Sequence, residues 1–451
     1  MRFSILLFII LFAWHSPAKA SEKVLDIQEI KSKSGIKAWL VEDKSLPIIA
    51  LKFSFKGAGS IHDGIEKQGL AQLLSNTMDE GAGDIKSQEF QKILSDNSIT
   101  LNFSAGRDNF GGQLKTLSRH KDIAFNLLKL SLTQPRFDEE PLERMRQANL
   151  ARIRSSMGDP DWITARLMND KAFEGRPYAL NSGGTLESLP KITAKDLQSH
   201  VTNWLTQDRL MIGVMGDINK DDLVKLLDDV FGSLPPKGST DNLSSFEIQN
   251  TGKIYLYPQE IPQTIISLAL PSIDVHDPDY YALQVMNYIF GAGGFGSRLM
   301  EEIREKRGLT YGIYSDTTNL DYTDFFTINT STKNNSVKQV LDIIISETDT
   351  IKTQKVSQED LSNSKSYLIG SLPMSLTSTD KISSILLSLQ LNNRPINYLD
   401  TYATNINTVT NEDILRVAKR IFNPEKMISV LVGKPEHIEN TIKIETLPNV
   451  Q

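Results

Sequence analysis

Two segments of the chain that lie 217 residues apart follow the same pattern without a gap. One begins at Ile192 and reads ITAKDLQSHVTNWLTQDRLMIGVMGD, and the other begins at Val409 and reads VTNEDILRVAKRIFNPEKMISVLVGK. Each indicates an amphipathic helix, then a polar turn, then an apolar strand that ends at a glycine, Gly216 or Gly433. This shared order predicts an internal duplication. The chain is therefore expected to fold as two copies of one structural unit.

Both repeats open with a helix start of the capping-box type, in which a threonine is followed three residues later by an aspartate. These pairs are Thr193 with Asp196 and Thr410 with Asp413. The beginnings of the two halves also correspond. IKAWLVEDKSLPIIALKFSFKGAGS and KIYLYPQEIPQTIISLALPSI each predict a strand, a turn that contains proline and a second, alternating strand. A helix is expected after each pair of strands, over Leu70–Met78 in the first half and Asp279–Ile289 in the second.

The joint between the halves is GSLPPKGSTDNLSSFEIQNTG, which is rich in Pro, Gly, Ser and Asn and is typical of a linker. The strands are predicted as hairpins with helices grouped between them. We therefore expect an α+β fold with two homologous domains, each a mainly antiparallel sheet with helices packed on one face. The predicted organisation is a signal peptide at 1–20, an N-terminal domain at 21–235, a linker at 236–252 and a C-terminal domain at 253–451.

The first residues of the chain have the pattern of a secretory signal. Arg2 precedes a short apolar run from Ile5 to Trp14, and Ala18-Lys19-Ala20 follows it. The run is too short to span a bilayer comfortably, and the A-x-A ending suits a signal peptidase. We therefore expect an exported, periplasmic protein, and a retained N-terminal anchor is the alternative. No later segment approaches the apolar length of a membrane span, so none is expected after signal cleavage.

Composition excludes several classes of partner and anchor. The chain has no cysteine, which excludes disulfides and lipid anchoring through cysteine. The formal charge is −6, and loss of Arg2 and Lys19 with the signal leaves −8. An acidic mature protein is a poor partner for nucleic acid or an anionic membrane surface. The sequence contains neither G-x-x-x-x-G-K-[ST] nor a G-x-G-x-x-G that follows a strand, the two glycine-rich motifs of nucleotide-binding proteins. It therefore offers no support for nucleotide binding.

The histidines do not form a zinc motif. A zinc helix carries two ligands four residues apart, and a catalytic site needs three protein ligands. No two of the mature histidines stand three to five residues apart, and a ligand role for the loop residue His62 is disfavoured. The mature histidines are His62, His120, His200, His276 and His437.

The stretch GLAQLLSNTMDEG, residues 69–81, predicts an amphipathic helix with its leucines on one face. Gln72, Ser75 and Asn76 have the spacing i, i+3, i+4, which places their side chains together on the other face. An H-x-x-E-H zinc helix carries its two histidines and its glutamate at these positions. The helix is therefore either an ordinary surface helix or a metal site that has lost its ligands.

A second informative stretch is IFGAGGFGSRLMEEIREKRGLTYGIYS, residues 289–315. It predicts a glycine-rich loop, a helix over Ser297–Arg307 that ends at Gly308, and a strand over Leu309–Tyr314. From the residues alone, a glycine loop followed by an ordinary helix with a solvated charge run is also a sufficient interpretation. The loop glycines are Gly291, Gly293, Gly294 and Gly296.

Together these stretches resemble the pitrilysin, insulinase and mitochondrial processing peptidase family of zinc metallopeptidases, in particular its bacterial members with two duplicated halves. The resemblance covers nearly the whole mature chain, and its most specific piece is GSRLMEEIREKRGLTYGIYS. In active members the first-half helix reads G-L-A-H-x-x-E-H, so Gln72 and Asn76 stand at the two histidines and Ser75 at the glutamate. A third ligand, a glutamate, falls at Ala151 or Arg152 in NLARIRSS.

This substitution pattern has a chemical consequence. Gln and Asn offer zinc only weak carbonyl oxygens, Ser75 is no base near neutral pH, and an arginine adds a repelling charge. The comparison with the family therefore implies that this chain binds no catalytic zinc of its own.

The second-half motif is intact by the same resemblance. The family's arginine and tyrosine, which reach a substrate held at the zinc site, correspond to Arg304 and Tyr311. This implies the non-catalytic subunit of a heteromeric zinc peptidase that degrades peptides. Its partner would be a zinc-bearing paralogous subunit, in a heterodimer. The alternative is a pseudopeptidase that serves as a peptide-binding or scaffold protein of the cell envelope.

Overall fold

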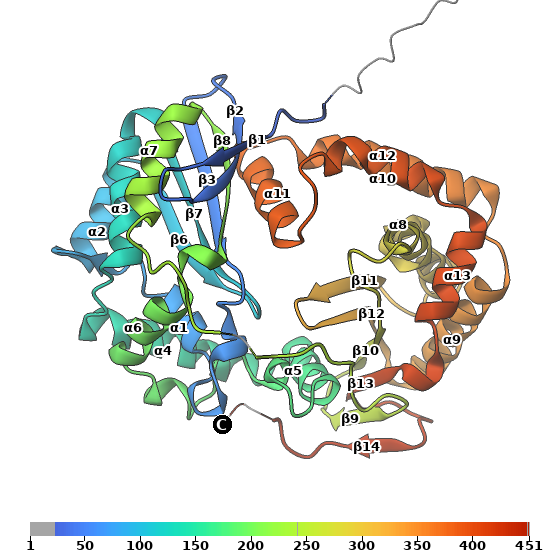
Figure 1. Ribbon diagram of the computed structural model, residues 1–451. Coiled ribbons are helices and arrows are strands. Elements are labelled where there is room, and N and C mark those ends of the chain that lie inside the picture. The colour runs from blue at the N-terminus through green and yellow to red at the C-terminus, as the bar shows by residue number, and fades with distance from the viewer. Residues whose placement is uncertain (1–22, 241, 449, 451) are drawn as a thin grey trace, which may run out of the picture.

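The computed structural model describes residues 23–240, 242–448 and 450, so the predicted signal peptide at 1–20 lies outside it. Within these residues the chain forms two six-stranded sheets that face each other, one from each half (Figure 1). The first sheet has the strand order β1-β2-β8-β3-β7-β6, and only the pair β2–β8 is parallel. Its strands are β1 (Gln28–Lys31), β2 (Lys37–Glu42), β3 (Ile48–Phe55), β6 (Thr100–Ala105), β7 (Phe110–Leu117) and β8 (Leu210–Gly216), and β4 (Gly81–Ala82) pairs separately with β5 (Ile85–Lys86).

The second sheet repeats this arrangement. Its order is β11-β12-β10-β13-β9-β14, and β9 pairs in parallel with β13, as β2 does with β8. The added strand β14 also pairs in parallel with β9. The predicted α+β fold with mainly antiparallel sheets is therefore confirmed. The strands are β9 (Ile254–Pro258), β10 (Gln263–Pro271), β11 (Ile313–Leu320), β12 (Thr323–Lys333), β13 (Ile428–Gly433) and β14 (Thr441–Lys443).

The duplicated segments have the same structure down to their caps. Both capping boxes form, at Thr193 before α6 (Ala194–Trp204) and at Thr410 before α13 (Asn411–Ile421). Each helix leads through a short turn to a central strand, β8 or β13. These strands end at glycines with φ of 136° and 145°, a conformation that disfavours other residues. Local sequence signals alone were sufficient to predict this repeat.

Most helices cover the outer face of their own sheet, where the apolar sides of β3 and β10 form the two main cores. Two predicted helices are shorter than expected: α1 ends at Ser75, because residues 76–80 form a turn, and α8 ends at Asn287, because a π-helical segment follows. The remaining outer helices are α2 (Ser87–Asp96), α3 (Lys121–Thr133), α4 (Glu139–Ser156), α7 (Lys220–Phe231), α9 (Val337–Thr353), α10 (Gln358–Ser375) and α12 (Tyr398–Thr408), with α1 (Leu70–Ser75) and α8 (Tyr280–Asn287).

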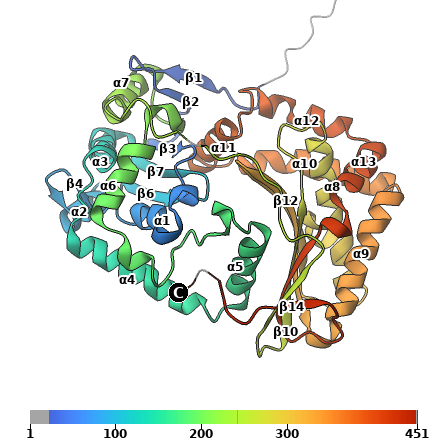
Figure 2. The ribbon, with the colours of Figure 1, turned by 60° about the horizontal axis from the view of Figure 1, so that its bottom comes forward.

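Two helices cross to the sheet of the other half and cover part of its inner face (Figures 1 and 2). Helix α5 (Pro160–Ala172) belongs to the first half, and its Leu167 packs with Val430 of β13. Helix α11 (Thr379–Leu391) belongs to the second half, and its Leu386 packs with Met215 of β8. The expectation that helices pack on one face is thus incomplete, since an exchanged helix covers part of the second face of each sheet.

The ends of the described chain also cross between the halves. The backbone N–H of Val24 donates to Asp400 Oδ1 (2.8 Å), and that of Leu186 donates to the carbonyl of Val450 (3.0 Å). The predicted linker contains no helix or strand in its described residues. It is nevertheless held against the second half, because the backbone N–H of Phe246 donates to the Tyr322 carbonyl (2.9 Å). The exact domain boundaries remain predictions. None of the described helices has the length and apolarity needed to cross a membrane.

Candidate functional site

Helix α1 is held in place at its N-terminus by a buried carboxylate. Asp63 accepts hydrogen bonds from the backbone N–H groups of Gly69 (2.9 Å) and Ala71 (3.0 Å). Burial raises the pKa of the Asp63 carboxyl to about 8, and these two N–H groups oppose the rise. Leu73 and Leu74 are fully buried in the first core. The polar face of α1 is therefore displayed from a firmly fixed position.

Gln72 and Ser75 of α1 and its C-cap residue Asn76 lie together, as their spacing predicts, and hydrogen-bond to one another. The Gln72 amide donates from Nε2 to Asn76 Oδ1 (2.7 Å) and to Ser75 Oγ (3.2 Å). Ser75 Oγ donates in turn to the Gln72 carbonyl (2.8 Å). Gln72 thus points its amide N–H₂ group toward the other two side chains. An amide N–H₂ group is a hydrogen-bond donor and cannot serve as a metal ligand. These three bonds join the side chains of Gln72, Ser75 and Asn76 into one local cluster.

Helix α4 adds no ligand to this cluster. Ala151 and Arg152 are both exposed, alanine has no ligating atom, and the Arg152 guanidinium carries a positive charge. Among the described residues, no group of three or more His, Asp or Glu side chains is placed to hold a metal ion. The donor set at Gln72, Ser75 and Asn76 contains neither imidazole nor carboxylate. These residues therefore do not fit the catalytic zinc that the resemblance implies for active members.

Two histidines, His62 and His200, are engaged in packing contacts. His62 stacks on Trp204, with ring centroids 3.7 Å apart and planes inclined by 13°. His200 on α6 is buried, and its Nε2 lies 2.9 Å from the Ala58 carbonyl, which places the proton on Nε2. Burial lowers the pKa of His200 to about 4, although the bond to Ala58 opposes this. His200 is thus a neutral core histidine.

The His200 environment predicts an acid sensitivity of stability. The unfolded chain binds this proton at a pKa near 6.5 and the folded chain only near 4, so the free energy of unfolding should fall as pH drops between these values. The loss amounts to about 3 kcal/mol at most. Urea denaturation of His200→Gln, whose amide can still donate to Ala58, should show a flatter pH dependence over this range than the unaltered protein. Parallel curves would contradict the assignment.

The glycine-rich loop and the following helix are less regular than predicted. The π-helical segments η7 (Tyr288–Ala292) and η9 (Met300–Glu305) flank the short turn η8 (Gly294–Gly296). A Cβ atom at Gly291 would lie 2.3 Å from Ser315 Oγ, so this position requires glycine. The strand predicted to start at Leu309 starts only at Ile313, because the Gly308 turn and its bonds to β12 occupy residues 308–312.

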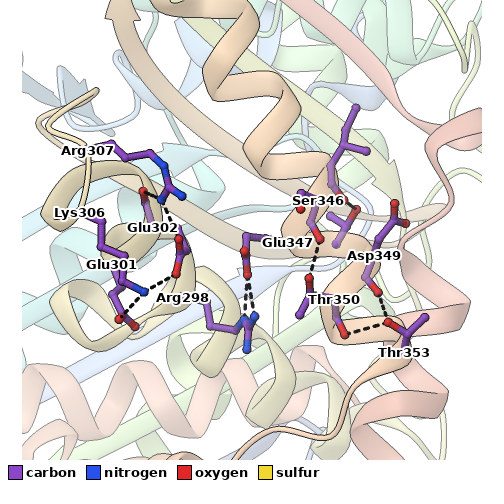
Figure 3. A network of polar contacts seen from close by, with 12 residues as sticks. Arg298, Glu301, Glu302, Lys306, Arg307, Ser346, Glu347, Asp349, Thr350 and Thr353 are labelled. Carbon is purple, nitrogen blue, oxygen red and sulfur yellow. Dashed lines mark hydrogen bonds and ion pairs between the residues drawn. The ribbon is translucent and has the colours of Figure 1, made fainter.

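One ion pair fastens this segment to helix α9, and further pairs lie within the segment itself (Figure 3). Arg298 donates from Nε (3.1 Å) and Nη2 (2.7 Å) to Glu347 of α9. Glu302 accepts from Lys306 (2.6 Å) and Arg307 (2.7 Å), and these bonds lower the pKa of its carboxyl. The segment that carries Arg304 is therefore tied down on its outer side.

Arg304 and Tyr311 stand on either side of the Gly308 turn. The Arg304 guanidinium lies over the ring of Phe295, 4.5 Å from its centroid, in a cation–π contact that no pattern in the sequence predicts. Tyr311 is 82% exposed. The loop below it is nevertheless fixed, since Thr310 Oγ1 donates to the Ser331 carbonyl (2.8 Å) and Thr332 Oγ1 to the Leu309 carbonyl (2.5 Å). Tyr311 thus exposes its phenol to solvent, whereas Arg304 is only partly exposed and also pairs with Glu305 (3.5 Å).

Comparison with known proteins gives consistent results. A family model described as "Insulinase (Peptidase family M16)" matches residues 49–185, and one described as "Peptidase M16 inactive domain" matches residues 191–368. The non-peptidase homolog YmxG of Helicobacter pylori is 27% identical, over 74% of this chain and 77% of the relative. The uncharacterized zinc protease YmxG of Bacillus subtilis is 24% identical, over 90% and 98%. A crystal structure titled peptidase M16 inactive domain, from Pseudomonas fluorescens, has a TM-score of 0.85 and 27% identity, over 94% and 100%.

Proposed function

The chain belongs to the peptidase M16, or insulinase, family, and from this membership we propose that it is the non-catalytic subunit of a heteromeric zinc peptidase. Its partner is a paralogous subunit that holds the zinc. This chain supplies Arg304 and Tyr311 to the partner's active site and helps to enclose peptide substrates. The signal pattern at residues 1–20 supports export of this chain, and the proposed complex therefore works in the periplasm.

The contrast between the two halves carries this proposal. In the first half, Gln72, Ser75 and Asn76 bond to one another and offer no metal ligand. In the second half, Tyr311 is exposed on a loop that hydrogen bonds hold in place. An aromatic ring that stays exposed to water does not contribute the roughly 2 kcal/mol of folding free energy that its burial would give. A fixed loop that displays such a ring is consistent with a group kept for contact with another molecule.

The chemistry of the two side chains suits a peptide that is being hydrolysed. The planar guanidinium of Arg304 can donate two hydrogen bonds to the oxygens of a bound peptide. The stack on Phe295 limits its rotation, which reduces the entropy lost on binding. The Tyr311 hydroxyl can donate to the oxygen that becomes negatively charged when a peptide carbonyl is attacked. Neither role requires this chain to hold a metal.

Purification of the mature chain alone, and mixed with a paralogue that has the duplicated architecture and an intact H-x-x-E-H, tests this function. We expect the lone chain to contain no stoichiometric zinc and to cleave no peptide. We expect the mixture to form a stable complex and to cleave a quenched fluorescent peptide much faster than the paralogue alone. Zinc-dependent cleavage by the lone chain would sink the proposal. A complex that forms without any gain in cleavage favours the scaffold alternative.

A further inference from the structure

The Tyr311 loop lies where the edge strand β11 separates from β12. The antiparallel ladder between these strands begins only at Ile313, although the sequence predicts an earlier start (Figure 1). Side chains alternate along β11, since Ile313 is buried in the core under the outer helices and Tyr314 is exposed on the opposite face. If the ladder continued at the same register, Tyr311 would stand opposite Thr332, on the same face as Ile313. A regular strand would therefore turn the Tyr311 phenol toward the helix-covered core.

Two threonine hydroxyls of β12 bind the carbonyls of the loop in place of backbone N–H groups. Thr330 Oγ1 donates to the Gly312 carbonyl (2.8 Å), and Thr332 Oγ1 donates to the Leu309 carbonyl (2.5 Å). Both threonines are buried, with 7% and 1% of their surface exposed. Because these carbonyls are satisfied by side chains, the loop does not need to pair with the backbone of β12.

Thr310 completes the same cluster from the side of the loop. Its Oγ1 donates to the Ser331 carbonyl (2.8 Å), accepts from the Gly312 N–H (3.1 Å) and lies 2.9 Å from Thr330 Oγ1. Threonine hydroxyls that bond to nearby backbone groups compete with a regular ladder. The cluster therefore favours the bent loop, in which the phenol of Tyr311 is exposed, over an extended strand.

We propose that Thr310, Thr330 and Thr332 are positioning residues for Tyr311. Their hydroxyls hold residues 309–312 off the sheet, which keeps the phenol where it can reach a molecule outside this chain. Without these hydroxyls, the segment extends β11 and the phenol turns toward the core. The threonines act only through Tyr311. Their part in catalysis rests on the proposed function, because it assumes that Tyr311 acts on a bound peptide.

Chemical nitration of the full mature chain, followed by mass spectrometry of its peptides, tests this positioning. Tetranitromethane nitrates exposed tyrosines, and the chain has no cysteine to compete for the reagent. In Thr330→Val/Thr332→Val, nitration of Tyr311 relative to the exposed Tyr367 should fall about tenfold, because two hydrogen bonds are lost and valine favours a strand. Thr332→Val alone, which removes one of these bonds, should lower it in the same direction but less.

Two matched variants separate the hydroxyls from other effects of substitution. Thr330→Ser/Thr332→Ser keeps both hydroxyls and should keep the nitration of Tyr311 within about twofold of the unaltered chain. Thr327→Val also places a valine on β12, at a threonine whose hydroxyl bonds to no described residue, and should likewise have no effect. Unchanged nitration of Tyr311 in the double valine variant, or an equal fall in the serine variant, overturns the inference.

Kinetics of the peptidase complex separates this inference from the proposed function. Thr330→Val/Thr332→Val should lower kcat about tenfold and leave KM within about twofold, since the phenol acts in the transition state. The serine variant should restore kcat, which a general loss of packing does not explain. If Tyr311→Phe lowers turnover and the double valine variant does not, the positioning role fails and the proposed function stands. The nitration test needs no partner, so it remains decisive if the proposed function fails.

Discussion

Replacing Arg304 by alanine or Tyr311 by phenylalanine in the assembled peptidase is expected to lower kcat/KM for a peptide by about 100-fold each. Loss of a single preorganised donor to a developing oxyanion costs rates of this order. For Tyr311→Phe the effect should fall mainly on kcat, because the oxyanion exists only in the transition state. For Arg304→Ala, which removes contacts to the bound peptide, KM should also rise. Steady-state kinetics of the complex with each variant checks both expectations.

Suitable controls lie close to these residues. Arg307 belongs to the same motif but pairs with Glu302, and Tyr367 is an exposed tyrosine on α10. Arg307→Ala and Tyr367→Phe should leave kcat/KM within about twofold of the unaltered complex, as expected of surface changes. Size-exclusion chromatography should show unchanged assembly for every variant. Normal turnover in assembled complexes of Arg304→Ala and Tyr311→Phe would refute the catalytic part of the proposal and leave a binding or scaffold role.

Substituting Gly213 by valine should lower the free energy of unfolding by about 3 kcal/mol and detach α11. A Cβ atom at this position would lie 2.5 Å from the Ser383 carbonyl oxygen and 2.9 Å from the Leu386 Cβ. The first of these is a backbone atom that cannot turn aside. Strand propensity taken alone predicts the opposite sign, since valine is favoured over glycine in a strand. The denaturant midpoint measures the stability, and hydrogen exchange over residues 379–391 reports the detachment.

Gly158→Val is the matched control for this change. A Cβ atom at Gly158 meets no atom within 4 Å, and its backbone does not require glycine. The control should therefore shift the free energy of unfolding by less than about 0.5 kcal/mol. It should also leave exchange in α11 unchanged. If Gly213→Val behaves like this control, the packing of α11 on β8 does not hold the two halves together as described.

Local signals were sufficient for much of the fold. Each capping box and terminal strand glycine depends on residues close in sequence, and the structure places them in both halves. The hairpin predicted at the start of each half is wrong, because β8 lies between β2 and β3 and β13 lies between β9 and β10. Predictions failed where distant contacts decide. Helix α1 is shorter than its apolar pattern suggests, and β11 begins late because Thr310 bonds to β12 instead of extending the strand. The observed ranges of α8 and η9 differ from the predicted helices at Asp279–Ile289 and Ser297–Arg307, because π-helical turns have no simple sequence signature.

The sequence by itself determined which chemistry the first-half site lacks. The ability to bind zinc is a property of imidazole and carboxylate groups, and no fold can confer it on Gln72, Ser75 or Asn76. Only the tertiary structure decided that Tyr311 is exposed beside a hollow lined by Asp161, and that α5 and α11 exchange sheets. An amphipathic pattern states that a helix buries one face. It cannot state which sheet receives that face, because the choice depends on contacts between residues far apart in the chain.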